Sequence, residues 1–115
     1  MVREGIYQSL STGQAYTARG VFVLRRGTFI GVGQSGAVYE GTYYLDPGGE
    51  TVTFDGCVRF EPETQLVTGP TVGPEGLTIA FKGRSPVPRP DASFTFVLDG
   101  GEISVAMKFI SPIPA

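Results

Sequence analysis

The residues best suited to chemistry stand in the stretch GVGQSGAVYEGTY, from 31 to 43, which holds four glycines and two tyrosines. Glycines spaced this way can cradle a phosphate when a strand precedes them and a helix follows. Here β-branched and aromatic residues follow, AVYEGTYYLD, and no Lys-Ser or Lys-Thr pair closes the loop. We therefore interpret Gly31, Gly33 and Gly36 as parts of a tight hairpin and not as a nucleotide site.

The remaining chemistry-bearing side chains do not form a catalytic set. The sequence has no histidine, so the commonest general base and the commonest metal ligand are missing. Cys57 is the single cysteine, which excludes an internal disulfide and a thiolate metal site. The acidic pairs Glu61/Glu63 and Asp99/Glu102 fall in loop sequences, where carboxylates are usually solvated. We expect no enzyme, no cofactor and no metal.

Composition argues against nucleic-acid and membrane partners. The 115 residues fit one domain, 1–115, and nine Lys and Arg against eleven Asp and Glu give a net charge of −2. Phe94 and Phe96 with Arg84 and Arg89 could stack single-stranded nucleic acid, but the strand pattern turns both phenylalanines inward. No apolar stretch approaches the roughly 20 residues of a membrane helix. The opening, MVREGIYQSL, has no apolar run typical of a signal peptide, so we expect a cytoplasmic protein.

Period-two alternation of apolar residues indicates the elements that must position any site. It is clearest from 50 to 60 and typical of half-buried antiparallel strands. Proline-rich stretches at 61–76 and 84–91 predict loops. The sequence predicts an all-β fold, an eight-stranded antiparallel up-and-down barrel, with an open sandwich as the alternative. The expected strands lie at about 4–11, 16–25, 28–33, 37–46, 50–60, 77–83, 92–98 and 102–110.

Gly41 raises the question of whether the interior is filled. It shares an inward face with Tyr39 and Tyr43, and an inward glycine either permits a bend or leaves room for something to approach. Both interpretations stay open. A hollow interior would bind a small apolar ligand and would be lined by Phe22, Tyr39, Gly41, Tyr43, Phe54, Phe81, Phe96 and Met107.

The first half of the chain resembles a known family. Gly5-Ile6-Tyr7, then Gly20-Val21-Phe22-Val23-Leu24, Gly27, Gly31-Val32-Gly33 and Val38-Tyr39-Glu40-Gly41-Thr42-Tyr43 are similar to the negative regulators of type III secretion, small bacterial β-barrel proteins. The likeness runs from about residue 4 to residue 110; it is strongest over the first 45 residues and is only a strand pattern afterwards. It implies a lipocalin-like barrel that pairs as a homodimer and regulates by contact with a transcriptional activator.

The resemblance also implies where such a partner would bind. The contact surface is an acidic loop between the fourth and fifth strands. This sequence reads Asp46-Pro47-Gly48-Gly49-Glu50 there, so that Asp46 and Glu50 are its two acidic ends. A homodimer is also expected from the outward face of the second strand, where Val21 and Val23 are apolar. Two functions therefore stay open, a regulator that acts by protein contact and a carrier or sensor of a small apolar ligand.

Overall fold

The computed structural model describes residues 2–15, 17–34, 36–67, 69–86, 93–97 and 103–114, with the backbone alone for 93–97. These residues form eight strands and no helix. The strands are β1 Gly5–Thr12, β2 Thr17–Arg25, β3 Thr28–Gly33, β4 Val38–Leu45, β5 Thr51–Phe60, β6 Leu77–Pro86, β7 Ser93–Val97 and β8 Ser104–Ser111. Within the described residues, no helix is long and apolar enough to cross a membrane.

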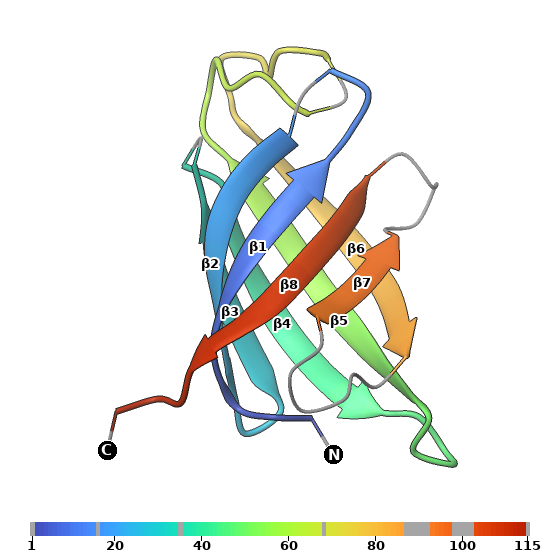
Figure 1. Cartoon of the computed structure of the whole chain (residues 1–115). Coiled ribbons are helices and arrows are strands. Elements are labelled where there is room, and N and C mark those ends of the chain that lie inside the picture. The colour runs from blue at the N-terminus through green and yellow to red at the C-terminus, as the bar shows by residue number, and fades with distance from the viewer. Residues whose placement is uncertain are drawn as a thin grey trace.

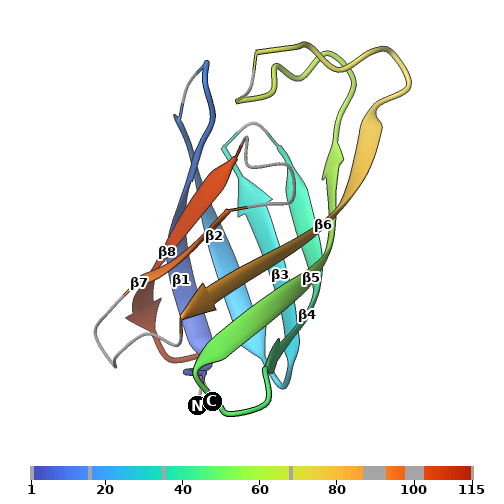
Figure 2. The same ribbon diagram turned by 90° about the vertical axis from the view of Figure 1, so that its right-hand side faces the viewer.

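All strands belong to one antiparallel sheet in the order β6-β5-β4-β3-β2-β1-β8-β7. Figures 1 and 2 show the sheet curled into a half-barrel around its inner face. Its two end strands, β6 and β7, approach each other, but no ladder joins them in the described part of the chain. The predicted all-β antiparallel architecture is confirmed, because alternation between buried and exposed residues is what a curled sheet with one apolar face requires.

The prediction of a loop at 84–91 is wrong for residues 84–86, which belong to a strand. β6 continues through Arg84 and Ser85 to Pro86, which pair with Thr53, Val52 and Thr51 of β5. Pro86 is the last residue of a strand at the end of the sheet order, where its missing N–H breaks no ladder hydrogen bond. The rest of that stretch, 87–91, lies outside the described residues.

The glycine-rich hairpin forms where the sequence predicts it, between the expected strands at 28–33 and 37–46. Gly31 and Gly33 lie within β3 and not in the turn. The turn follows them: the amide of Gly33 donates to the carbonyl of Ala37 at 2.8 Å, and Gly36 has a φ of 88°. That left-handed backbone favours glycine, so only Gly36 is needed for the turn itself.

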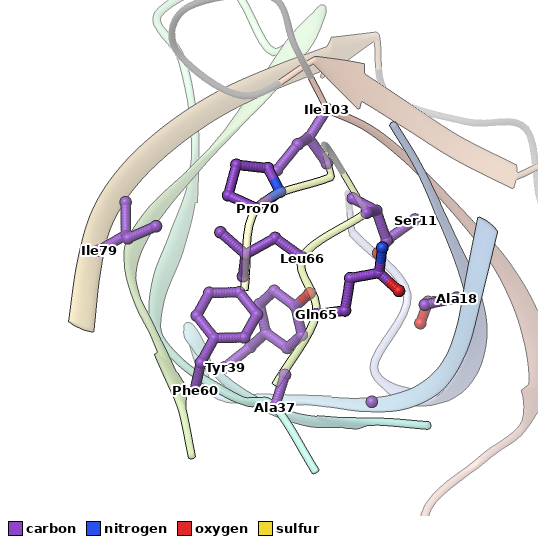
Figure 3. Close-up of a pocket in the computed structure, with 13 residues that line it drawn as sticks. Ser11, Ala18, Ala37, Tyr39, Phe60, Gln65, Leu66, Pro70, Ile79 and Ile103 are labelled. Carbon is purple, nitrogen blue, oxygen red and sulfur yellow. The ribbon is translucent and has the colours of Figure 1, made fainter. Parts of the chain in front are cut away.

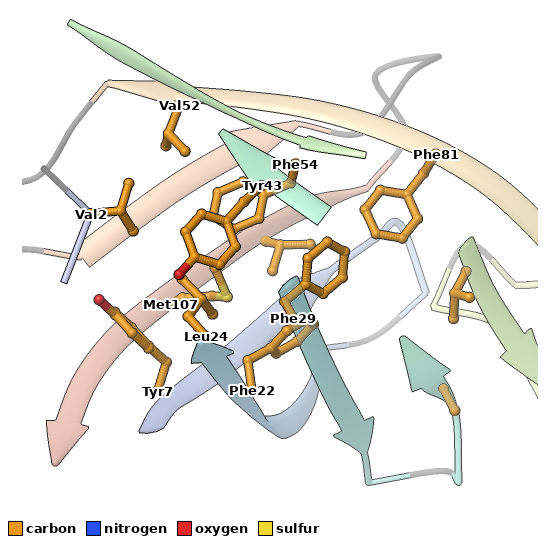
Figure 4. Close-up of a cluster of buried hydrophobic side chains, with 13 residues drawn as sticks. Val2, Tyr7, Phe22, Leu24, Phe29, Tyr43, Val52, Phe54, Phe81 and Met107 are labelled. Atoms are coloured by element: carbon orange, nitrogen blue, oxygen red, sulfur yellow. The ribbon is translucent and has the colours of Figure 1, made fainter. Parts of the chain in front are cut away.

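A packed aromatic core fills one half of the curled sheet (Figure 4). Phe29 lies at its centre, with ring centroids 5.8 Å from Phe54, 6.0 Å from Phe22 and 6.0 Å from Phe81. Centroid distances of this size are those of favourable tilted and edge-to-face pairs. The core consists of Val2, Tyr7, Phe22, Leu24, Phe29, Ala37, Tyr43, Val52, Phe54, Val58, Phe81, Val105 and Met107.

Two facing glycines let the sheet fold sharply between β4 and β5. Gly41 pairs with Gly56 on the inner face. A Cβ at Gly41 would lie 2.2 Å from the carbonyl oxygen of Asp55, and one at Gly56 would lie 2.1 Å from that of Glu40. The two backbones therefore approach more closely than any side chain allows, which is how glycine introduces curvature into a sheet.

The segment 61–76 crosses one end of the half-barrel as an irregular hairpin. Leu66 donates its amide hydrogen to the Pro70 carbonyl at 2.8 Å, and Val72 donates to Thr64 at 2.8 Å. In both views this segment lies beside the turn that joins β1 and β2. We call residues 61–76 the cap loop.

Candidate functional site

A pocket of about 300 Å³ lies under the cap loop (Figure 3). The pocket exists because the inward side chains of β1 and β2 become smaller toward the cap loop. β1 presents buried Tyr7 at the core end and then Ser9 and Ser11 toward the cap loop. β2 changes in the same direction, from Leu24 and Phe22 to Gly20 and Ala18. Small side chains at this end of β1 and β2 leave a volume that the core cannot fill.

Most of the sheet contributes to the wall of the pocket. In Figure 3, Ser11 and Ala18 form one wall, and Phe60, Ile79 and Ile103 lie on the others. The complete described lining is Ser9, Ser11, Ala18, Gly33, Ala37, Tyr39, Phe60, Gln65, Leu66, Val67, Pro70, Ile79 and Ile103.

The cap loop covers this pocket with apolar side chains. Leu66 and Pro70 face the interior from the cap loop, and Gln65 lies beside them (Figure 3). Val67 of the same loop also lines the pocket. The Gln65 amide nitrogen donates to the carbonyl of Gly69 at 3.3 Å, which ties that side chain to its own loop. The cap loop thus supplies an apolar roof to a pocket whose other walls come from the sheet.

The polar groups of the pocket are few and uncharged. Ser9 and Ser11 are 2% and 5% exposed, and their hydroxyls lie on the β1 wall. No Asp, Glu, Lys or Arg is among the described lining residues. A mainly apolar cavity with a few polar groups is typical of a small-molecule site.

The expected cavity lining largely falls elsewhere. Of the eight residues expected to line it, Tyr39 does line the pocket. Gly41 lies against the backbone of β5, and the Phe96 side chain is outside the described residues. The other five belong to the packed core: Phe22, Tyr43, Phe54, Phe81 and Met107. Alternation with period two identifies which side chains face inward, but it does not show where along a strand the packed core ends.

Asp46 is engaged within its own hairpin. Its carboxylate accepts hydrogen bonds from Thr51 Oγ1 at 2.5 Å and Thr53 Oγ1 at 2.8 Å, with Arg84 Nε at 3.9 Å. These hydroxyl donors, with a smaller contribution from the Arg84 charge, hold the pKa of Asp46 below its usual value. Glu50 is exposed at the tip of the same hairpin. The two acidic ends therefore have different environments, one bonded internally and one in solvent.

Tyr7, at the core end of the sheet, has a phenol whose pKa is shifted by its surroundings. Burial raises the pKa of its phenol to about 12, with a smaller contribution from nearby Tyr43. The hydroxyl donates to the Arg3 carbonyl at 2.5 Å. Its ring packs edge-on against Phe109, 5.4 Å away, and the Arg3 guanidinium lies 3.7 Å over that second ring. The Tyr7 phenol therefore stays protonated at neutral pH as part of the core.

Val21 and Val23 lie in an apolar region on the outer face of the sheet. Val21 pairs with Val32, and Val23 pairs with Ile30 on β3. Val21, Ile30 and Val32 are 45%, 52% and 53% exposed. We call Val21, Val23, Ile30 and Val32 the outer patch. The sequence pattern identified Val21 and Val23 on β2 but not Ile30 and Val32 on β3. These two residues could have been identified, because they alternate with inward Phe29 and Gly31.

The pocket residues missed by the sequence analysis did leave a signal. Ser9, Ser11, Ala18 and Gly33 are all small residues at inward positions near one end of their strands. Small inward residues on three neighbouring strands predict a void at that end. The cap-loop residues had no such signal, since proline-rich loops show no periodicity that says which side chains turn inward.

No protein-family model matches the chain, and no curated protein matches it in sequence. The likeness to the type III secretion regulators stays a prediction.

Proposed function

We propose that this protein is a non-enzymatic, cytoplasmic binding protein that holds a small apolar molecule in the pocket under the cap loop. The observation that carries the proposal is the pocket itself, about 300 Å³ enclosed by apolar side chains of the sheet and the cap loop. Ligand sites are usually concave, largely preformed and mainly apolar, and their volumes begin at about this size. The proposal includes closure of the sheet into a lipocalin-like eight-stranded barrel, supported by the approach of β6 to β7.

The environment of the pocket favours binding over catalysis. Its described lining holds hydroxyl and amide groups and no titratable acid–base pair. The aromatic core below it is close-packed, so that a ligand would rest on a rigid floor that includes Tyr39, whose ring lies 5.1 Å from that of Phe22. A rigid site costs less conformational entropy when the ligand binds.

A pocket-filling variant tests this proposal. A Cβ on Gly33 would lie 3.5 Å from that of Ala37, in ordinary contact, so Gly33→Leu can extend into the pocket without moving the backbone. We expect the neutral probe phenylnaphthylamine to gain fluorescence with the native protein and to lose most of that gain with Gly33→Leu. Thr78→Leu, on the exposed side of β6 next to Ile79, is the matched control. Equal probe binding by Gly33→Leu and the native protein would refute the pocket as the site.

Regulation by protein–protein contact is the second candidate, and the outer patch favours it. Four apolar side chains on adjacent strands form a cluster in which Val21, Ile30 and Val32 are roughly half exposed. Contiguous exposed apolar residues usually mark an interface. We propose that this patch pairs two copies of the chain, and that the hairpin carrying exposed Glu50 is left free for a protein partner such as a transcriptional regulator. Co-purification of a partner that is lost on Glu50→Lys but kept on Glu75→Lys would support this function.

A further inference from the structure

We propose that the pocket selects an uncharged, largely aliphatic molecule that ends in one hydroxyl or carbonyl group, which Ser9 and Ser11 hydrogen-bond. This inference rests on the proposed ligand-binding function and deepens it by naming the ligand class. Three features of the pocket support it: the charge of its walls, the state of its two serines and its volume.

Charge comes first. The described lining contains no cationic side chain and no anionic one. An ion transferred into such a pocket would lose its hydration without gaining a partner, which costs several kilocalories per mole or forces the ion to neutralise. A fatty acid anion, whose carboxylate would need a lysine or arginine, therefore does not suit this pocket.

The two serines supply the hydrogen bonds that a neutral group can use. Both hydroxyls are more than nine-tenths buried and line the pocket two residues apart on the same face of β1. Their ladder neighbours on the inner face are Gly20 and Met107 for Ser9, and Ala18 and Val105 for Ser11, none of which offers a polar side chain. Among the described residues, no fully buried side-chain oxygen lacks a hydrogen-bond partner, so the two hydroxyls contribute as polar groups that border the pocket. A hydroxyl that borders a pocket can both donate to and accept from a neutral group of a ligand.

The opposite walls determine the rest of the molecule. Phe60 and Ile79 face the β1 wall across the pocket, Ile103 lies beside that wall next to the β8 strand, and Leu66 covers the pocket. This arrangement puts the polar end of a ligand at Ser9 and Ser11 and its hydrocarbon part against Phe60 and Ile79. The volume of about 300 Å³ lies at the lower end of the range that is usual for ligand pockets and suits a small molecule.

Ligand discrimination by the native protein gives the first test. Nonanol and nonanoate differ in the polar end and have nearly the same chain, and each is titrated against bound phenylnaphthylamine at pH 8. We expect nonanol to displace the probe at a concentration at least about tenfold lower than nonanoate does. Displacement by nonanoate at an equal or lower concentration would overturn the inference.

Serine substitutions give the second test. The double change Ser9→Ala with Ser11→Ala keeps the shape of the wall and removes both hydroxyls. We expect its affinity for nonanol to fall by about tenfold, while that for phenylnaphthylamine, which has no hydroxyl or carbonyl group, stays unchanged. Ser104→Ala, at an outward position of β8, is the control. If the double variant does not fold, Ser11→Ala alone is measured. Unchanged nonanol affinity in a folded variant would overturn the role of the serines.

The two proposals fail in different ways. If phenylnaphthylamine does not bind the native protein, or binds Gly33→Leu equally well, the pocket is not a ligand site and both proposals fall. If the probe binds and Gly33→Leu blocks it, but nonanoate competes as well as nonanol, only the ligand class is wrong.

Discussion

The amide of Ala15 donates a hydrogen bond of 2.7 Å to the carbonyl of Val67 and so fastens the cap loop to the turn between β1 and β2. The same turn approaches the loop closely at Gly13, where a Cβ would lie 2.6 Å from the Val67 oxygen. The roof of the pocket is thus held at one side by backbone contacts with a neighbouring turn.

Gly13→Val should release the cap loop and leave the rest of the fold intact. The added side chain collides with the Val67 backbone. The described residues of the loop form no strand ladder with the sheet, so the loop is the part that can move. We expect faster proteolysis within 61–76 and a loss of about 1 kcal/mol of stability. Gly73→Val is the control, because a Cβ there meets nothing within 4 Å. Cleavage of the loop at the native rate would contradict the role of this contact.

Gly41→Ala should strongly destabilise the fold. The new methyl would overlap the backbone of β5, which cannot move away as a flexible side chain could. We expect a loss of about 3 kcal/mol in the free energy of unfolding, measured by urea denaturation. Gly73→Ala should change it by less than about 0.5 kcal/mol. A neutral Gly41→Ala would mean that β4 and β5 are not this close.

Alkaline pH should weaken the native protein through Tyr7. Its folded-state pKa of about 12 lies above the value of about 10 in an unfolded chain, so the stability it provides is complete below pH 10 and is lost as the pH rises toward 12. We expect about 2 kcal/mol to be lost over this range. Tyr7→Phe should show a flatter dependence in denaturant titrations at pH 9 and pH 11.5, and exposed Tyr44→Phe should behave like the native protein.

Acid should remove the contribution of Asp46 to the hairpin. Its folded pKa is lowered by Thr51 and Thr53, so its stabilising effect is present above the unfolded value of about 4 and is lost as the pH falls through the folded value. Asp46→Asn should therefore melt at a lower temperature than the native protein at pH 7, and this difference should shrink at pH 3. Asp55→Asn, which breaks an exposed ion pair with Lys82, should have little effect. An Asp46→Asn deficit that is equal at both pH values would exclude the carboxylate as its cause.

Lysines in the outer patch should separate the proposed homodimer. Val21→Lys combined with Val32→Lys puts two charges on neighbouring exposed positions of β2 and β3. We expect sedimentation to give a dimer for the native chain and a 12.2 kDa monomer for the variant. Tyr44→Lys, a similarly exposed residue on β4, should remain dimeric. A native protein that is already monomeric at micromolar concentration would end the proposal.

Strand positions could be predicted closely from this sequence, whereas only part of the site left a signal in it. Alternation such as Val52, Phe54, Val58 identifies a strand and its inward face, because burial on one side is a local property of the chain. The pocket depends instead on how side-chain sizes add up across neighbouring strands, as at Ser11 and Ala18, which pair between β1 and β2. It also depends on the cap loop, where Leu66 and Pro70 turn inward through backbone bonds that no periodicity records.

Strand order has a consequence for how the chain reaches this fold. Among the described residues, six of the seven ladders join consecutive strands and can form as soon as each hairpin exists. The ladder between β1 and β8 must wait for a strand about a hundred residues later. During synthesis β1 is paired with β2, but its other edge, which later pairs with β8, is still open. An open strand edge of this kind can pair with another molecule. Its sequence GIYQSLST carries polar residues at Gln8, Ser9, Ser11 and Thr12. The serines that line the pocket thus also make β1 less apolar during the time in which its edge is open to other molecules.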